Sequence, residues 1–381
     1  MALKRIWGAI FQGLGKKDGN SPNRAPNRDG SIGFVADSHG MRTVGPGEVL
    51  HAQLASTRLR VLVPAAEIAR QREVLLVPLV TMVRGGFDVG SMAAVVLAKL
   101  PTFRVAKFDA AALNRLESWL IDAKRRTRLF ADLSDDYESY SETFRAPVLS
   151  QYQQLLVEHC ALVVPTRAFA DRLAARGARR VTVIEDPYEA KSSRPPHEFS
   201  KGVLRLCWFG NLGPQNEDFL KSQIPALASR IGSHTVALEM VTDVIAVETV
   251  KEIGRLAAAQ SPTFSVTFTQ WSPQSVEAAL ERADLVLLPH DPEMPWNFVK
   301  SHNRLVTAIR AGRFAIAAPI PSYQELASYA WLGDSLADGI RWALAHPSEV
   351  TERIVAGQAY VESRFSPATI GQKWLHALTT D

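Results

Sequence analysis

Cysteine is scarce in this sequence. The two cysteines, Cys160 and Cys207, lie in separate apolar runs, and no Cys-x-x-Cys pair or Cys/His cluster suggests a metal site. Two isolated thiols do not make a disulfide framework, so both are predicted to be small core residues of a reduced, cytosolic protein.

Over most of the chain there is also no excess of charge of either sign. The formal net charge is +4, and residues 1–30 supply all of it, with six Lys and Arg against two Asp. A nucleic-acid-binding protein normally carries a basic face on its folded body. The balanced charge after residue 30 therefore gives no reason to expect a nucleic-acid partner.

The first thirty residues contain no apolar run long enough to span a bilayer, and no small-residue cleavage site. Residues 1–17 resemble a short basic amphipathic helix, which could rest on an anionic membrane surface. A loose tail, or a helix docked on the body of the protein, explains the same pattern. Residues 18–30 are rich in Asn, Pro, Asp, Ser and Gly and are predicted to be a linker.

Strand and helix patterns alternate along the rest of the chain, and 381 residues are more than one ordinary core needs. Short apolar runs predict strands at 32–36, 74–80, 93–97, 128–133, 162–165 and 181–184, and then at 204–209, 235–241, 264–268, 285–288 and 314–318. Helices are predicted at 48–71, 110–124, 148–160 and 168–176, between the later strands, and at 334–345, 348–363 and 367–379.

This alternation predicts an α/β fold with two Rossmann-like domains, each a parallel sheet covered on both faces, facing each other across a cleft. The first domain would span residues 31–190 and the second 203–363. Residues 191–202 have the composition of an interdomain linker, and the final helix, 364–381, could pack back on the first domain. Ligands of such sheets bind at the carboxyl ends of the strands.

One strand–loop–helix–strand unit, Ala283 to Pro319, carries cations at its predicted helix start. The helix is expected to open at Lys300, with Ser301 as N-cap and Gly312 as the left-handed residue at its end. Lys300 and Arg304 would share one helix face, where the helix dipole and backbone N–H groups favour an anion. We interpret this as a diphosphate clamp, although a solvated basic helix start explains the same residues.

Five stretches together resemble a known family. They are Ala55 to Arg60 (ASTRLR), Asp132 to Asp136 (DLSDD), Val164 to Pro187, Trp208 to Asn211 (WFGN) and Lys300 to Gly312. In order and spacing they are similar to bacterial glycosyltransferases of the GT-B architecture, over roughly residues 31–380. The resemblance implies a GT-B-like fold whose first domain binds an acceptor and whose second binds a nucleotide-sugar donor.

The resemblance also implies a cytoplasmic glycosyltransferase of cell-envelope or capsular polysaccharide synthesis, at the inner face of the membrane if the tail binds there. Its partners would be a nucleotide sugar, as co-substrate and not as cofactor, and a glycan or lipid-linked acceptor. The sequence has no Asp-x-Asp, the motif that glycosyltransferases of the other large architecture use to hold a metal on the diphosphate. A metal-independent mechanism is therefore expected.

The sequence departs from the family at the donor helix. Many retaining GT-B enzymes carry two glutamates there, eight residues apart. The corresponding positions here are about Val299 or Lys300 and Thr307, so those donor contacts do not carry over. Lys300, Ser301 and Asn303 would have to hold the donor with different chemistry.

Residues that follow the strands of the second domain are further candidate donor contacts. Gly210 and Asn211 could bring the backbone close to a phosphate, or form a plain turn. Their spacing is not Gly-x-Gly-x-x-Gly, so no nicotinamide cofactor is indicated. Asp243 could accept a hydrogen bond from a ribose or sugar hydroxyl, or cap the next helix.

Three later residues have the same ambiguity. Trp271 could stack on the nucleobase or cover the end of the sheet. His290 could contact the donor sugar or be incidental in its loop. Glu325, with its neighbour Tyr323, could reach a hydroxyl or cap a helix.

In the first domain, Asp37 and His39 follow the first strand, where a general base could deprotonate an acceptor hydroxyl. Arg58 could face the donor phosphate across the cleft. Three further acceptor or cleft candidates also end strands, and helix capping explains the two aspartates equally well: Lys99, Asp135 and Asp136.

Two other functions are compatible with these patterns. A nucleotide-sugar epimerase would use the donor contacts and acid/base groups but no acceptor cleft. A non-catalytic nucleotide-sugar-binding or scaffold protein would keep the clamp and not need Asp37 or His39. Fold does not decide among them.

Overall fold

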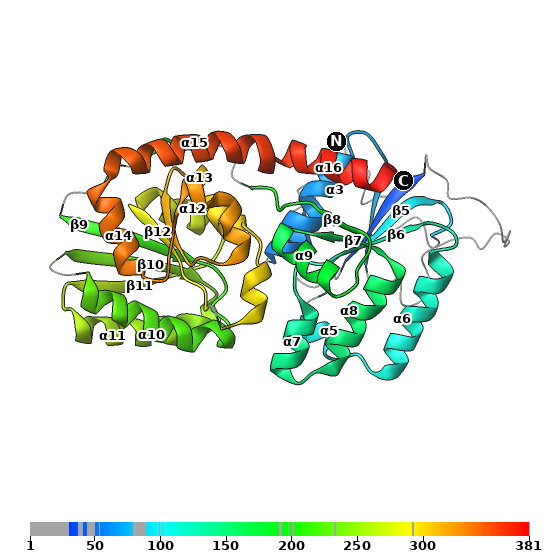
Figure 1. Cartoon of the computed structure of the whole chain (residues 1–381), viewed down its shortest axis with the longest axis horizontal. Helices are drawn as coiled ribbons and strands as arrows, with labels where there is room; N and C mark the ends of the chain where they lie inside the picture. Colours follow the sequence, from blue (N-terminus) through cyan, green and yellow to red (C-terminus); the bar gives the residue numbers. More distant parts are fainter. Residues whose placement is uncertain are drawn as a thin grey trace. The chain divides into compact units, whose positions relative to one another are not determined.

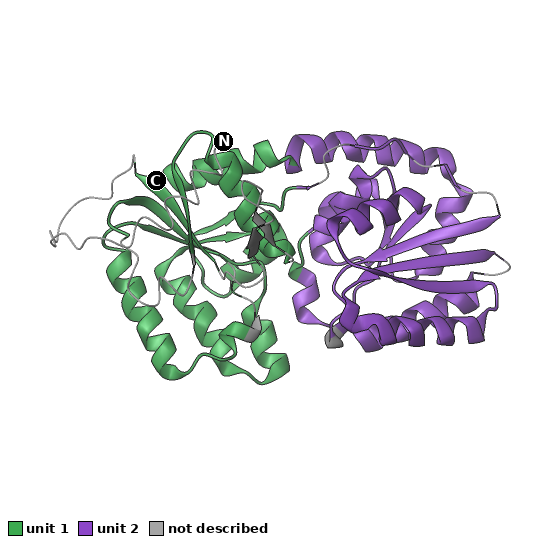
Figure 2. Cartoon of the chain, turned by 180° about the vertical axis from the view of Figure 1, so that it is seen from behind, with its two compact units in different colours: residues 1–187, 299–301, 366–381 green, residues 188–298, 302–365 purple. Residues whose placement is uncertain are grey.

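The computed structural model describes residues 30–36, 41–43, 50–52, 54–78, 89–98, 100, 102–189, 193–196, 198–199, 202–231, 234–291 and 293–380. The chain forms two compact units (Figure 2). Unit 1 comprises Met1–Pro187, Val299–Ser301 and Ser366–Asp381, and unit 2 comprises Tyr188–Phe298 and His302–Phe365. Each unit is a six-stranded sheet with helices on its faces (Figure 1).

The sheet of unit 1 is parallel throughout, in the order β4-β1-β5-β6-β7-β8. Its strands are β1 (Ser31–Ala36), β4 (Val74–Pro78), β5 (Met92–Leu97), β6 (Arg128–Asp132), β7 (Ala161–Val164) and β8 (Val181–Val183). The chain leaves β1 for β4 on one side and later enters β5 on the other. The switch point of this sheet therefore lies between β1 and β5.

The helices of unit 1 are α2 (Ala55–Thr57), the π-helical η1 (Arg58–Leu62), α3 (Val63–Ile68), α5 (Thr102–Val105), α6 (Ala110–Ala123), α7 (Tyr137–Phe144), α8 (Pro147–His159), α9 (Arg167–Ala175) and the C-terminal α16 (Pro367–Thr379). α16 completes the core of this unit, because Ile370, Trp374 and Leu378 pack among the strand residues. The Trp374 ring meets Phe34 of β1 edge-on, with centroids 5.8 Å apart.

The sheet of unit 2 is also parallel, in the order β11-β10-β9-β12-β13-β14. Its strands are β9 (Val203–Phe209), β10 (Thr235–Thr242), β11 (Phe264–Gln270), β12 (Leu285–Leu288), β13 (Phe314–Ala317) and β14 (Trp331–Leu332). Every residue of β12 and β13 is buried, as expected for strands covered on both faces.

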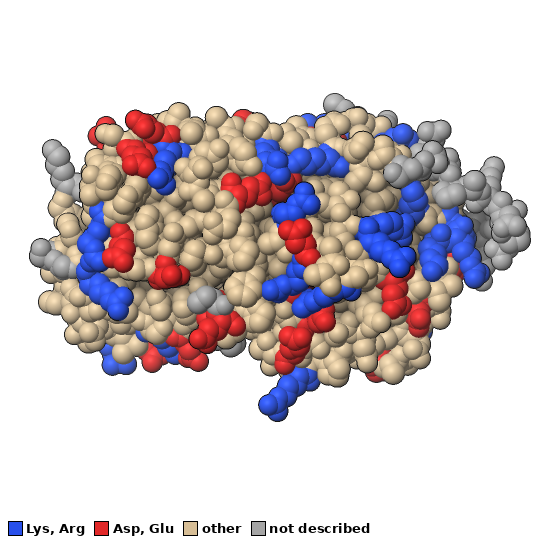
Figure 3. Space-filling model, viewed as in Figure 1, with Lys and Arg blue, Asp and Glu red and all other residues tan. Residues whose placement is uncertain are grey.

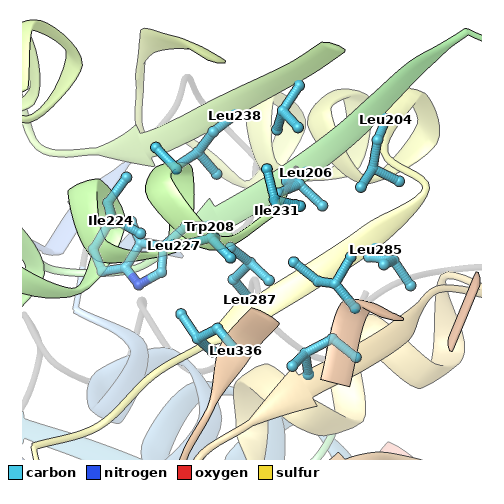
Figure 4. Packing of buried hydrophobic residues seen from close by; sticks show 14 of the residues in the cluster. Leu204, Leu206, Trp208, Ile224, Leu227, Ile231, Leu238, Leu285, Leu287 and Leu336 are labelled. Atoms are coloured by element: carbon cyan, nitrogen blue, oxygen red, sulfur yellow. The ribbon is translucent and has the colours of Figure 1, made fainter. Parts of the chain in front are cut away.

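The helices of unit 2 are α10 (Pro214–Arg230), η2 (Val244–Ala246), α11 (Val247–Gln260), α12 (Pro273–Arg282), η3 (Pro295–Val299, whose last residue clusters with unit 1), α13 (Asn303–Arg310), η4 (Pro321–Tyr329), α14 (Leu336–Ala345) and α15 (Pro347–Phe365). Alternate residues of β9 serve two cores. Leu206 and Trp208 pack with α10, as Figure 4 shows, whereas Cys207 packs on the opposite face with α12 and α13.

The predicted helix at 48–71 begins too early. Residues Leu50–Ala52 form β3, which pairs antiparallel with β2 (Met41–Thr43), and helical structure starts at Ala55. The pairing with β2 satisfies backbone groups that the sequence pattern assigned to a helix. Within the described residues, no helix is both long and apolar enough to cross a membrane.

Part of the predicted linker is packed on unit 2. The Arg194 N–H donates to the Arg310 carbonyl at the end of α13 (3.2 Å), and Gln358 of α15 donates to the Arg194 carbonyl (2.5 Å). Gly312 follows α13 with φ 68°, and a Cβ there would stand 2.2 Å from the Pro195 carbonyl oxygen. Glycine is thus required both for the left-handed turn that the sequence predicts and for this close approach.

Candidate functional site

The switch point of the unit 2 sheet lies between β9 and β12. The chain leaves β9 for β10 and β11 on one side and then enters β12 on the other. Gly210 directly follows β9, and His290 comes two residues after β12. In open parallel sheets, ligands bind at the carboxyl ends of the strands at such a point.

Arg304 of α13 connects these two strand ends. Its Nη1 donates to the Phe209 carbonyl at 3.4 Å, and its Nη2 lies 2.9 Å from Nε2 of His290. Gly210 lies against the guanidinium: its φ is 151°, and a Cβ at this position would stand 3.1 Å from Arg304 Nη1. A side chain at residue 210 would therefore meet both backbone strain and the Arg304 side chain.

Tyr323 completes the group around Arg304. Its Oη lies 3.0 Å from His290 Nε2, and the two rings meet edge-on. Because arginine only donates, Nε2 is an acceptor and the imidazole is neutral. Burial raises the pKa of Tyr323, while the charge and a hydrogen bond of Arg304 oppose that rise. These contacts hold Arg304 through neutral groups and leave its positive charge available for an anion.

α13 begins later than the sequence predicts. Its first residue is Asn303 and its N-cap is His302, whose side chain makes no capping hydrogen bond. The predicted Ser301 cap is wrong, because Ser301 Oγ donates instead to the Asp186 carboxylate at 2.5 Å. A hydroxyl bonds a charged oxygen more strongly than a helix end. The positive end of the α13 dipole still lies beside Arg304.

Lys300 does not share a helix face with Arg304, so the predicted helical alignment of the two cations is wrong, whereas a role of Lys300 in donor binding stays a prediction. Lys300 precedes α13 and belongs to unit 1, whereas Arg304 belongs to unit 2. Lys300 Nζ lies 3.4 Å from Tyr140 Oη and 4.0 Å from a carboxylate oxygen of Asp135. A spacing of four residues aligns side chains only inside a continuous helix, and the chain is not α-helical at Lys300.

Three of the stretches that resemble the family meet around Arg60, which the sequence prediction did not single out. Arg60 is fully buried in η1, and its guanidinium bonds the Asp132 carboxylate through Nε (3.0 Å) and Nη2 (2.5 Å). Its Nη1 donates to the Ile184 carbonyl (2.5 Å) and to Asp186 (3.2 Å). Ser301 donates to the same Asp186. In this structure, the stretches build a buried ion network inside unit 1.

The paired aspartates after β6 separate into two roles. Asp136 is fully buried, caps α7 through the Ser139 N–H and forms ion pairs with Arg172 and Arg176, both at 2.9 Å. Burial raises its pKa, but the hydrogen bond from Ser139 and the two arginines outweigh burial and hold the pKa below its ordinary value. Asp136 is thus a structural cap, the alternative that the sequence left open, whereas Asp135 lies near Lys300.

The other donor candidates lie at the carboxyl end of the unit 2 sheet or near it. Asp243 caps η2 by accepting a hydrogen bond from the Ile245 N–H (3.1 Å). This is the capping role that the sequence offers as the alternative to a contact with a sugar hydroxyl. Trp271 packs at the edge of the core, and its backbone N–H donates to the Thr242 carbonyl. Asn211 is exposed after Gly210.

Glu325 is engaged by other side chains. It lies in η4, where Tyr360 Oη donates to it (3.1 Å) and Arg364 forms an ion pair at 2.8 Å. His302 Nε2 lies 3.4 Å from its second oxygen. These contacts tie η4 to α13 and α15.

The predicted site residues of unit 1 are only partly described. Arg58 is buried in η1. Asp37 and His39 follow β1 in the sequence, and Lys99 follows β5, so all three come after strands that flank the switch point; they lie outside the described residues. Among the residues that are described, no group of three His, Cys, Asp or Glu is placed to hold a metal ion.

No protein-family model matches this chain, and no curated protein matches it in sequence. Solved structures do match it in fold. An alpha-glucosyltransferase in complex with UDP and a 13-mer DNA containing an HMU base has a TM-score of 0.59 at 11% identity, over 92% of this chain and 99% of that one. WaaG, a glycosyltransferase involved in lipopolysaccharide biosynthesis, has a TM-score of 0.57 at 14% identity, over 92% of this chain and all of its own.

A mutant of S. aureus TarM, crystallised with fondaparinux, alpha-GlcNAc-glycerol and UDP, has a TM-score of 0.55 at 12% identity and covers 79% of this chain. The chain spans 58% of the length of that TarM chain. The two parallel six-stranded sheets and these likenesses define the fold as the GT-B fold of glycosyltransferases. The fold predicted from the sequence is thereby confirmed.

Proposed function

We propose that this protein is a glycosyltransferase that moves a sugar from a nucleotide-sugar donor to a hydroxyl acceptor. The observation that carries the proposal is Arg304, held by neutral groups beside Gly210 at the switch point of the unit 2 sheet. A guanidinium there would bind the donor diphosphate, because arginine pairs with phosphate oxygens through two parallel bonds.

The geometry suits stabilisation of a leaving diphosphate. Arg304 has five N–H donors, and its bonds to the Phe209 carbonyl and to His290 use one on each terminal nitrogen, which leaves donors for phosphate oxygens. Negative charge grows on the diphosphate as the glycosidic bond breaks, so a fixed cation beside a helix start stabilises the transition state more than the bound donor. Such a site could work without a metal, as the absence of Asp-x-Asp led us to expect.

Other parts of the function remain predictions. Asp37 or His39 would act as general base, and Lys300 and Asn303 would support donor binding. The likeness to WaaG, a glycosyltransferase involved in lipopolysaccharide biosynthesis, supports a role in cell-envelope or capsular polysaccharide synthesis. A cytoplasmic location stays a prediction from the sequence. The structures with similar folds were solved with different molecules beside UDP, including a 13-mer DNA and fondaparinux, so the acceptor must come from experiment.

The first test is a thermal-shift panel of nucleoside diphosphates and nucleotide sugars, with and without magnesium. A ligand at about a hundred times its Kd should stabilise the protein by roughly 2.7 kcal/mol. Arg304→Ala should weaken binding of the selected nucleotide by about ten- to a hundredfold, since it removes charge-assisted bonds worth roughly 1.5–3 kcal/mol. Arg304→Lys should recover part of the loss. Arg341→Ala, an exposed arginine on α14, is the matched control.

Transfer is then measured with the selected donor and a panel of acceptors. Asp37→Asn and His39→Ala should spare donor binding and remove transfer; full activity in both would end the base assignment. Donor binding that survives in Arg304→Ala would overturn the proposed site. An epimerised nucleotide sugar as product, or binding without any turnover, would favour the epimerase or the scaffold protein.

A further inference from the structure

Arg304 differs from other cations of unit 2 in the groups that hold it. On the face of unit 2 that Figure 3 shows, Lys and Arg side chains lie mostly beside Asp or Glu. Such ion pairs in this unit include Lys221 with Glu217, Arg282 with Glu239, Arg341 with Asp338, and Arg353 with Glu349. Among the residues that the structure describes, no carboxylate pairs with Arg304. Its position therefore depends on uncharged groups.

The buried ring of His290 carries the acceptor for Arg304. Its Nε2 lies 2.9 Å from Arg304 Nη2 and 3.0 Å from Tyr323 Oη. Because Nη2 only donates, Nε2 must offer its lone pair, and the proton of the neutral ring lies on Nδ1. Tyr323 is fully buried and meets the His290 ring edge-on, with centroids 5.4 Å apart. The structure thus assigns one of the two neutral tautomers to His290.

A proton on Nε2 of His290 would break this arrangement. The protonated ring carries a positive charge and N–H donors on both nitrogens, so no lone pair would remain for Arg304. A hydrogen of Nε2 would then point at a guanidinium nitrogen 2.9 Å away, and two like charges would repel in buried surroundings. Arg304 would have to move away from His290, and with that from its place beside Gly210.

The titratable and charged groups at the His290 ring come from three segments. Arg304 belongs to α13 and Tyr323 to η4. On the loop of His290 itself, Asp291 follows the ring, and its Oδ1 accepts from the Glu293 N–H at 2.9 Å. The charged group in direct contact with Nε2 is therefore the cation Arg304, which opposes a proton at that nitrogen.

We propose that His290 is a positioning residue for the donor, and that donor binding requires its neutral form. The inference rests on the proposed function, in which Arg304 binds the diphosphate. His290 then acts through Arg304 and not by touching the donor sugar, the role that the sequence suggested. Histidine changes its charge between about pH 5 and pH 8, so the donor is held at neutral pH and released as the pH falls.

The first test needs no ligand. Heteronuclear nitrogen NMR of the histidine side chains of the full-length protein reports which ring nitrogen carries the proton. The His290 signals are those that disappear in His290→Gln. At about pH 8, where histidine is neutral, the proton should be on Nδ1 and Nε2 should be bare. A proton on Nε2 would overturn the inference, whatever the protein binds.

The second test is a pH profile of donor affinity. The probe is the nucleotide sugar that the thermal-shift panel selects, because its diphosphate is esterified at both ends and does not titrate in this range. From about pH 8 to about pH 5, wild type should lose about ten- to a hundredfold in affinity, the value of a hydrogen bond to a charged group. His290→Gln keeps an acceptor oxygen that does not titrate, so its affinity should change by less than about twofold.

Two further variants separate positioning from a merely structural role. His290→Phe keeps a ring against Tyr323 but offers no acceptor, so it should bind the donor weakly at every pH. His234→Gln replaces an exposed histidine of unit 2 and is the matched control, which should keep the wild-type profile. Thermal unfolding checks that each variant folds, and the comparison of wild type with His290→Gln stands without the Phe variant.

The outcomes distinguish this inference from the proposed function. A flat wild-type profile, or an equal fall in His290→Gln, would overturn the role of His290. Tighter binding in acid would overturn it too, because it would place a protonated His290 directly on the phosphate. Unchanged donor affinity in Arg304→Ala would end the proposed donor site itself. Loss of binding in Arg304→Ala, with a wild-type profile in His290→Gln, would end only the role of His290.

Discussion

Replacing Arg60 with methionine should strongly destabilise unit 1 without affecting unit 2. Arg60 is fully buried and is bound to two carboxylates, Asp132 and Asp186, both inside the same unit. Burial acts to lower the pKa of Arg60, but the two carboxylates outweigh burial and raise it. The arginine therefore stays charged, and its removal leaves two negative groups in the core.

The magnitude follows from what remains after the change. Methionine fills much of the volume but offers no donor to Asp132, Asp186 or the Ile184 carbonyl, and it loses the contact with the Trp374 ring, 5.4 Å from the guanidinium. Breaking a buried ion pair on one side costs about 3–5 kcal/mol. The double variant Arg60→Met/Asp132→Leu should cost less than Arg60→Met, because it also removes one stranded carboxylate.

Hydrogen exchange read by mass spectrometry is the suitable assay, because a protein with two units need not unfold in one step. Peptides of β6 and α16 should exchange faster in Arg60→Met, while peptides of β9 and β12 serve as the internal control. The defect should shrink at acidic pH, where the stranded carboxylates are protonated. Protection of β6 within about 1 kcal/mol of wild type, or a double variant worse than the single one, would refute the reasoning.

The remaining predictions concern one cap and one glycine. Asp136→Asn keeps an N-cap but loses both ion pairs, so it should cost about 1–2 kcal/mol at neutral pH. The pKa of Asp136 in the folded protein is held below its ordinary 3.8. The stability that the two ion pairs add is therefore fully present above pH 3.8 and is lost as the pH falls below it. The denaturation midpoints of wild type and variant should converge in acid. Gly210→Ala should cost about 1–3 kcal/mol and also weaken nucleotide binding, since its Cβ would meet Arg304. Gly177 has φ 92° and open space around it, so the control variant Gly177→Ala should strain the backbone but bind the nucleotide normally. Unchanged nucleotide binding in both Gly210→Ala and Gly177→Ala would count against Gly210 as part of the site.

Local sequence pattern predicted most of the elements. The run Leu285 to Leu288 is a strand with those bounds, and the last helix, 367–379, has its predicted bounds too. Gly177 ends α9 with φ 92° where the sequence placed its end. These features depend on neighbouring residues alone: apolar spacing, capping residues and the freedom of glycine at positive φ.

Prediction from the local sequence pattern was wrong where residues far away in the sequence, or a later helix start, changed the local structure. Ser301 has the chemistry of an N-cap, but the Asp186 carboxylate, 115 positions earlier, takes its hydroxyl. Lys300 and Arg304 have helical spacing, but the chain is helical only from Asn303. Residues 50–52 form a strand because β2 pairs with them.

The sequence by itself determined two α/β units with parallel sheets and a buried cysteine in each, and it predicted that ligands bind at the carboxyl ends of the strands. The strand order, and with it the switch point of each sheet, came from the tertiary structure. Only the tertiary structure decided which polar side chains meet at the strand ends. It placed Arg304 against Gly210 and His290, and it drew Arg60, Asp132 and Asp186 into one buried network. Periodicity records which face of an element is buried, but the partner of a charged side chain depends on how separate elements pack.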